Sequence, residues 1–312
     1  MQMWEGSPAV QSVAFRTRMG RFLERESVLG YLLLAPGVAM LVMFVAYPFL
    51  LAIYLSLTNK LIAVESSGQF VGIQNYVNLL RDSVFRETVV NTFNYTFVSV
   101  FFKLVLGTAM ALALNEALPL KNLLRGTMLL PWIVPTALSS LAWLWMFDST
   151  FSVINRMLES SGLVETGPVW LGSGFWAMLS IQIVNVWRGV PFFGITLLAG
   201  LQTIPQDLYE AADVDGAGAW RKFWHITTPL LMPVTAVVTL FSIIQTFADF
   251  EIVFVLTRGG PGNSTHLFAT LTQQIAIQNG RLGPGAAISL FMFPVLVVVV
   301  LLQLRYLRRG GS

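Results

Sequence analysis

The sequence predicts an all-α integral membrane protein, a bundle of six membrane-spanning helices. Of its 312 residues, 55% are hydrophobic and only 11% are charged, and the mean hydropathy is +0.69. Soluble domains carry roughly a quarter charged residues, so a bilayer must cover much of this chain. Six apolar runs reach the roughly 20 residues that a helix needs to cross the hydrocarbon core. They are Leu29–Leu57, Val89–Leu114, Thr127–Phe147, Phe175–Leu201, Leu230–Leu256 and Ala286–Tyr306.

These runs organise the chain as one membrane domain with two tails. Residues 1–28 are polar to basic and form the N-terminal tail, residues 29–307 hold the six spans, and residues 308–312 form the C-terminal tail. The first run is longer than the apolar core of a signal peptide, so we expect it to remain as an anchor. With both tails in the cytoplasm, the cytoplasmic segments hold 11 Lys and Arg residues and the outer loops hold 6. This bias favours both termini inside.

No catalytic or metal-binding motif is recognisable. The chain has no cysteine, and His225 and His266 fall on opposite sides of the membrane in this topology. A phosphate-binding loop of the type GxxxxGK[ST] is also missing, so ATP must be bound elsewhere if it is used. The net charge of +3 comes from basic residues scattered at segment ends, which fits membrane orientation and not nucleic-acid binding. We expect neither catalytic residues nor a metal site.

Polar side chains line one face of the fourth span and one face of the fifth. Charged groups in a bilayer are costly and usually face a bundle interior or a wet cavity, so the two faces predict a hydrophilic passage. Their spacing is that of one helix face. The residues are Gln182, Asn185, Arg188 and Gly189 in the fourth span, and Ser242, Gln245, Thr246 and Asp249 in the fifth.

A hydrogen-bonded seam is the alternative to a passage, with Arg188 and Asp249 neutralising each other. The passage is favoured, because a seam rarely needs both an ionised pair and several amides. Lys103 stands alone within the second span, which predicts an interfacial contact or a side chain that reaches toward the headgroups. For Glu251, near the outer end of the fifth span, we expect a structural ion pair.

A compact polar stretch, EAADVDGAGAWRKFWHITTPLLMP, interrupts the apolar sequence from Glu210 to Pro233. It faces the cytoplasm in the predicted topology. We expect a short helix after Pro205, capped by Asp207, with Glu210 near its N-terminus, where a carboxylate suits the helix dipole. Glycine and alanine permit close approach of another surface, so the stretch is interpreted as a docking element.

The same stretch resembles the EAA loop of ABC importer permeases. "EAADVDGA", followed by Phe223, Ile226, Pro229 and Pro233, matches that loop, with Thr228 where leucine is usual. Other stretches typical of the carbohydrate-uptake branch, similar to maltose-type and glycerol-phosphate-type permeases, follow in the expected order: YPFLLAIYLSL, FVGIQNY, AGLQTIPQDLYEAA and LTRGGP. The resemblance implies a type I ABC importer permease fold in a bacterial or archaeal cytoplasmic membrane, with an EAA loop at 207–229.

Several partners are implied by this resemblance. They are a second permease subunit, expected to be a different chain, two ATPase subunits that bind ATP and Mg, and an external solute-binding protein that delivers a carbohydrate-like substrate. Membrane lipid surrounds the spans, and no cofactor is expected in this chain. The EAA helix would sit in a groove of the ATPase and transmit its closure to the spans. The expected coupling residues are Glu210, Ala211, Ala212, Asp215, Gly216 and Ala217.

Maltose-type permeases also imply a set of substrate contacts. Their motifs fall on Gly189 and Phe192 in the fourth span and on Ser242, Thr246 and Asp249 in the fifth, with Ser139 as a further position. Arg188 and Asp249 are charged where the maltose-type pocket is neutral, which leaves a neutral sugar, a polyol or an anionic sugar derivative open. The expected pathway residues are Ser139, Arg188, Gly189, Phe192, Ser242, Gln245, Thr246 and Asp249.

Two other functions fit the sequence less well. An ion-coupled secondary transporter could use Asp249 or Glu251 as a proton or sodium site, but it would leave the EAA helix unexplained. An intramembrane enzyme would need a nucleophile and a base at credible spacing, and none is found.

Overall fold

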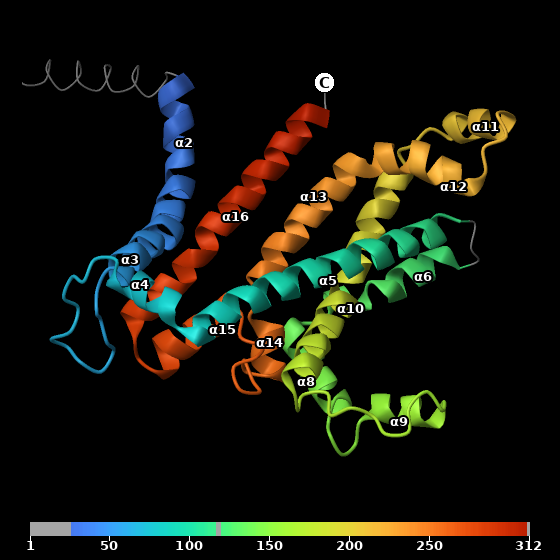
Figure 1. The fold of residues 1–312 in the computed structure, drawn as a ribbon. Helices are drawn as coiled ribbons and strands as arrows, with labels where there is room; N and C mark the ends of the chain where they lie inside the picture. The colour runs from blue at the N-terminus through green and yellow to red at the C-terminus, as the bar shows by residue number, and fades with distance from the viewer. Residues whose placement is uncertain (1–25, 117–119, 311–312) are drawn as a thin grey trace, which may run out of the picture. The chain divides into compact units, whose positions relative to one another are not determined.

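The computed structural model describes residues 26–116 and 120–310, and these divide into two units between Tyr54 and Leu55 (Figure 1). In the first unit, helix α2 (Glu26–Leu41) continues through a π-helical turn, η1 (Val42–Ala46), into α3 (Tyr47–Ser56), which ends just inside the second unit. Residues Leu29–Ser56 form an apolar helical segment of 28 residues, long enough to cross a bilayer. It matches the predicted first span to within one residue.

The second unit contains four further long apolar helices. They are α5 (Ser83–Asn115), α10 (Gly174–Leu201), a continuous segment Ala219–Leu256 that includes α13 (Thr228–Phe247), and α16 (Leu282–Gly310). Helix α5 begins earlier than predicted because Asp82 caps it, its side chain accepting a hydrogen bond of 3.0 Å from the Phe85 amide. Counting the first unit, the described part of the chain has five spanning helices, or six if one bent pair counts as a span.

That bent pair corrects the predicted third span. Thr127–Phe147 was expected to form one helix, but Asn122–Ile133 and Thr136–Met146 meet at 89°. The chain forms α6 (Lys121–Met128), α7 (Leu130–Ile133) and α8 (Thr136–Met146). Proline has no N–H to continue a helix and forces the preceding residue out of the helical conformation. Val134, before Pro135, is accordingly extended, with φ −62° and ψ 133°.

Shorter helices connect the spans. Helix α4 (Gln74–Arg81) precedes α5, α9 (Val153–Ser160) follows α8, and α15 (Phe268–Gln273) with η3 (Gln274–Gln278) precedes α16. Between α10 and α13 lie α11 (Gln206–Val214), α12 (Ala219–Lys222) and η2 (Phe223–Thr227), and α14 (Glu251–Leu256) follows α13. Figure 1 shows α11 and α12 at one end of α10, with α8, α9 and α14 at its other end.

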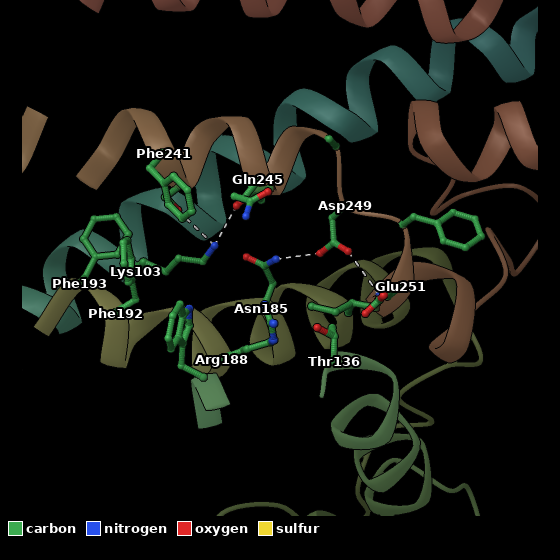
Figure 2. A pocket seen from close by; sticks show the side chains of 17 residues that line it. Lys103, Thr136, Asn185, Arg188, Phe192, Phe193, Phe241, Gln245, Asp249 and Glu251 are labelled. Carbon is green, nitrogen blue, oxygen red and sulfur yellow. Dashed lines mark hydrogen bonds between the residues drawn. The ribbon is translucent and has the colours of Figure 1, made fainter. Parts of the chain in front are cut away.

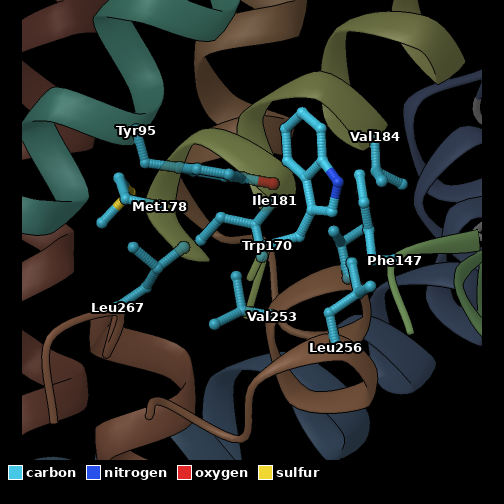
Figure 3. Close-up of a cluster of buried hydrophobic side chains, with 10 residues drawn as sticks. Tyr95, Phe147, Trp170, Met178, Ile181, Val184, Val253, Leu256 and Leu267 are labelled. Carbon is cyan, nitrogen blue, oxygen red and sulfur yellow. The ribbon is translucent and has the colours of Figure 1, made fainter. Parts of the chain in front are cut away.

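A buried apolar cluster fixes the irregular pieces of the second unit against α10 (Figure 3). It joins the end of α8 to α14 and to the loop that precedes α10, and it includes Tyr95 of α5, which is fully buried. Lipid tails are as apolar as these side chains, so packing, and not exclusion from water, must hold the membrane-embedded part of the cluster together. The cluster comprises Tyr95, Phe147, Trp170, Met178, Ile181, Val184, Ile252, Val253, Leu256 and Leu267.

Phe147 provides a test of this packing. Its side chain is 1% exposed, whereas that of the nearby Phe151 is 75% exposed. We expect Phe147→Ala to lower the free energy of unfolding by about 3–5 kcal/mol, because it leaves a cavity in the cluster, and Phe151→Ala to change it by less than about 0.5 kcal/mol. Reversible denaturation of the detergent-purified protein measures both. Equal effects of the two variants would contradict the described core.

Candidate functional site

Apart from Gln182, whose side-chain amide donates to Asn94 Oδ1 at 2.8 Å, the polar faces predicted for the fourth and fifth spans meet at one cavity (Figure 2). It lies between α5, α10 and α13, with α7, α8 and α14 contributing to its wall, and its volume is about 470 Å³. Small-molecule sites commonly measure roughly 300–1,000 Å³. Seven of the eight expected pathway residues line it: Arg188, Gly189, Phe192, Ser242, Gln245, Thr246 and Asp249.

Ser139 does not line the cavity. It lies on α8, is 4% exposed, and donates its hydroxyl to the backbone carbonyl of Thr136 at 2.9 Å. Thr136, the first residue of α8, lines the cavity in its place. The bend at Pro135 turns α8 so that its first residue, and not the next turn, reaches the cavity.

Asp249 occupies a break between α13 and α14. Its Oδ2 accepts hydrogen bonds from the Tyr95 hydroxyl at 2.6 Å and from the Asn185 side-chain amide at 2.9 Å, and its Oδ1 lies 3.4 Å from the Ile252 backbone amide in the first turn of α14. One carboxylate thus connects α5, α10 and the fifth span. The expected helical face continues to this residue, although the helix that carries the other three ends at Phe247.

The predicted alternative, a neutralising pair of Arg188 and Asp249, does not form. Within residues 26–116 and 120–310 the one salt bridge joins Lys222 to Asp213. The ion pair expected for Glu251 is absent from the same residues; its side chain is exposed and lines the cavity. Both expectations assumed that a charge within a span must be matched by the opposite charge, whereas neutral donors satisfy Asp249.

Of the two expectations for Lys103, the reach toward the headgroups is wrong. Its side chain is 5% exposed and does not reach toward the headgroups. The ammonium group donates to the Thr246 hydroxyl at 2.8 Å and approaches the Ser242 hydroxyl at 3.4 Å, and Figure 2 shows it pointing toward Gln245. The sequence held a signal for this, because Lys103 belongs to a helical stripe of small and polar residues on α5. The buried members of that stripe include Thr88, Thr92, Thr96, Ser99, Lys103, Gly107 and Ala111.

Gly189 makes room for Lys103. A Cβ atom at Gly189 would lie 2.6 Å from Cδ and from Cε of Lys103, a distance that real Cβ atoms do not tolerate. The lysine stem therefore crosses α10 directly over this glycine. Resemblance to maltose-type permeases implied a substrate contact for Gly189, and the structure adds a packing requirement.

Arg188 lies beside Gly189 and has no hydrogen-bond partner in the described chain; its Nε is buried and unpaired. Aromatic rings form a neighbouring wall of the cavity. Phe192 stacks on Trp132 of α7 with ring centroids 5.6 Å apart and lies tilted against Phe241 of α13 at 5.2 Å. The cavity thus offers cations, hydroxyls, amides and flat apolar rings within one space.

The predicted EAA segment forms α11 and the turn after it. Gly216 has φ +72°, the left-handed conformation that glycine adopts most readily. Its amide donates to the Asp213 carbonyl at 3.0 Å, and the Ala217 amide donates to the Ala212 carbonyl at 2.8 Å, which together end the helix in a Schellman motif. Glycine is needed here by the backbone, since nothing lies within 4 Å of where its Cβ would be.

Two details of this helix were predicted wrongly. Helix α11 begins at Gln206, with Pro205 in the capping position and no side-chain cap, so Asp207 lies in the first turn and does not cap. Glu210 lies in the middle of the helix, and a contact with the N-terminal dipole is therefore not available to it. The start was misplaced because proline itself fixes the backbone angle from which a helix can begin.

The helix is exposed yet firmly attached. No residue of α11 is buried. The Tyr209 hydroxyl is 2.9 Å from that of Thr227 in η2, and Lys222 of α12 binds Asp213 at 2.6 Å. These contacts connect α11 to the start of α13 and leave Glu210 without a hydrogen bond or ion pair to any residue of the described chain. Helix α11 is therefore an exposed element that is held through Tyr209 and Asp213 and leaves the Glu210 side chain unpaired within the described chain.

Comparison with known proteins identifies the family of the chain. Residues 103–310 match the family described as "Binding-protein-dependent transport system inner membrane component". The sulfoquinovosyl glycerol transport system permease protein of Agrobacterium fabrum is 35% identical over 91% of each chain. The trehalose/maltose transport system permease protein of Thermococcus litoralis is 38% identical over 92% of this chain and 95% of that one.

Solved structures agree on the fold. A chain of a bacterial ABC transporter that imports the acidic polysaccharide alginate superimposes with a TM-score of 0.78 at 24% identity, covering 94% of this chain and 99% of its own. The family match is inconsistent with an ion-coupled secondary transporter and with an intramembrane enzyme. The chain therefore belongs to the inner membrane components of binding-protein-dependent transport systems and is a multi-pass permease subunit of an ABC importer, not an enzyme.

Proposed function

We propose that this permease subunit carries a sugar or sugar derivative through the cavity between α5, α10 and α13. It works in a bacterial or archaeal cytoplasmic membrane with a second, different permease chain, two ATPase subunits that bind ATP and Mg, and an external solute-binding protein. The relatives support a carbohydrate, since their names specify sulfoquinovosyl glycerol and trehalose or maltose. A solved relative includes a periplasmic protein bound to an alginate pentasaccharide, which supports the external partner.

The cavity is the observation that carries this proposal. A polyhydroxylated ligand that leaves water needs partners for its own hydroxyls. The cavity presents Gln245, Thr246 and Asn185 beside the aromatic wall formed by Phe192, which can cover the apolar face of a sugar ring. The residues proposed as substrate contacts are Arg188, Gly189, Phe192, Ser242, Gln245, Thr246 and Asp249, with Thr136 in place of Ser139.

Coupling to the ATPase is proposed for α11 and the turn that follows it. The proposed contacts are Glu210, Ala211, Ala212, Asp215 and Ala217, while Gly216 shapes the turn. Helix α11 protrudes with no buried residue, and its attachment to η2 and α12 gives a mechanical path to α13. ATP hydrolysis belongs to the partner because this chain lacks a phosphate-binding loop.

The topology is tested first, by cysteine labelling. The chain has no native cysteine, and Ser160 and Gly218 are both exposed, in α9 and beside α12. Helix α10 lies between them in the sequence, and its 28 residues extend roughly 42 Å at 1.5 Å per residue. We expect an impermeant thiol reagent applied to intact cells to label Ser160→Cys and to label Gly218→Cys only after lysis. Equal labelling of both in intact cells would contradict the proposed orientation.

The coupling surface is tested by reversing one charge. Because Glu210 has no partner within the described chain, Glu210→Arg leaves the fold intact and changes only what α11 presents. We expect the affinity of the permease for its ATPase to fall at least tenfold, or about 1.4 kcal/mol, measured by co-purification and by ATP hydrolysis. Glu165→Arg, an exposed position after α9, is the matched control and keeps full assembly. Normal assembly and hydrolysis with Glu210→Arg would show that the ATPase binds elsewhere.

The cavity is tested with two threonines of α13. Thr246 lines it, whereas Thr239, two turns earlier, does not. In proteoliposomes that hold the complete transporter, we expect Thr246→Val to reduce uptake of a sugar retained by the external binding protein at least tenfold, because a hydroxyl in the passage is lost. Thr239→Val should stay within about twofold of wild type, or roughly 0.4 kcal/mol. Similar uptake by both variants would place the passage outside this cavity.

A further inference from the structure

The acidic and basic groups of the cavity are unequally satisfied. Its lining contains the cations Lys103 and Arg188 and the acids Asp249 and Glu251. Three donors from the protein engage Asp249: the Tyr95 hydroxyl, the Asn185 amide and, more weakly at 3.4 Å, the Ile252 backbone amide. The Glu251 side chain is exposed to the cavity. The negative groups therefore need nothing further.

The two cations, Lys103 and Arg188, have fewer hydrogen-bond partners than Asp249. Lys103 is 5% exposed, and its ammonium group contacts only two neutral hydroxyls, those of Thr246 and Ser242. The Arg188 guanidinium has no hydrogen-bond partner in the part of the chain that the structure describes, and its Nε is buried. A cation at membrane depth is costly unless an acceptor or a counter-ion meets it. Within the described residues, no carboxylate or carbonyl oxygen forms a hydrogen bond or a salt bridge with these two groups, and Asp249, whose charge acts on Lys103, forms no salt bridge with it.

Both cations line the same cavity, and their charges act on each other. The Lys103 stem crosses α10 over Gly189, the residue next to Arg188. Lysine contributes a compact charge and arginine a planar fork of donors, and both are the side chains that bind carboxylate, sulfonate and phosphate groups. Figure 2 shows both side chains at the cavity that Phe192 and Phe241 also line.

We propose that Lys103 and Arg188 form an anion-binding subsite and that the transported molecule is a sugar derivative with an acidic substituent. This inference rests on the proposed function, because it names the class of sugar that the same cavity accepts. The acidic group pairs with the two cations, and the ring lies toward the aromatic wall. A neutral sugar would offer these cations hydroxyl acceptors but no negative charge to pair with them in the occupied cavity.

The test compares two probes that differ in one group, methyl glucoside, with a CH₂OH, and methyl glucuronide, with a carboxylate. Binding is measured by tryptophan fluorescence on the complete transporter in lipid nanodiscs, since Trp132 lines the cavity. We expect the glucuronide to bind at least tenfold more tightly. Lys103→Met keeps the stem that packs over Gly189 and removes the charge, and Arg188→Gln removes the fork; each should reduce the preference to about threefold or less.

Two further variants separate a charge effect from a general loss of folding. Glu251→Gln removes a negative charge from the lining and should increase the preference for the glucuronide. Arg156→Gln, on α9 and outside the cavity lining, should leave the preference as it is in the wild type. A preference that changes with opposite sign in Glu251→Gln and in Lys103→Met cannot come from unfolding.

Three outcomes would overturn the inference, and they differ in what else they affect. Equal binding of the two probes by the wild type removes the anion subsite and leaves the carbohydrate function standing. A preference that persists in both Lys103→Met and Arg188→Gln places the anion elsewhere in the transporter. If neither probe binds, the carbohydrate function of the cavity fails, and the anion subsite fails with it.

Discussion

The cavity depends on one carboxylate that is satisfied by neutral donors. Asp249 stands in the break between α13 and α14 and receives hydrogen bonds from Tyr95 of α5 and Asn185 of α10. Buried charges are tolerated when enough donors surround them, and here those donors come from separate spans. These hydrogen bonds hold the start of α14 against α10. Because neutral donors satisfy Asp249, it forms no salt bridge with Lys103 or Arg188 in the described chain. Tyr95 also belongs to the apolar cluster, so packing and polar contacts meet at one side chain.

Much of this arrangement could be predicted from the sequence. The length and hydropathy of the runs gave the position of most spans, because crossing a bilayer imposes a minimum apolar length. The 3.6-residue period placed Ser242, Gln245 and Thr246 on one face, and the structure places all three at the cavity. The same period also predicted that Asp249 lies at the cavity, as it does. The period was applied past Phe247, however, where the helix ends.

The remaining features depend on contacts between distant segments. Lys103 was misplaced because its polar partners, Thr246 and Ser242, come from another span, and the side chain considered alone suggested that it reaches toward the headgroups. The bend at Pro135 was missed because membrane helices often absorb proline without breaking, and the sequence gives no measure of which outcome will occur. Gly216 was recognised as important, but the left-handed turn that requires it could not be distinguished from a close approach to a partner.

The attachment of α11 to η2 has a consequence for the size of the motions that this subunit needs. The contact of Tyr209 with Thr227 connects α11 to η2, which leads directly into α13. The cavity side chains Ser242 and Thr246 lie toward the other end of α13, whose 20 residues extend about 30 Å. A rigid rod of that length turns a small angle at its base into a large displacement at its tip. A rotation of about 5° around η2 moves the far end by roughly 2.6 Å at 1.5 Å per residue, close to the length of one hydrogen bond. By geometry alone, a tilt of a few degrees at α11 is therefore enough to separate Lys103 from its partners on α13.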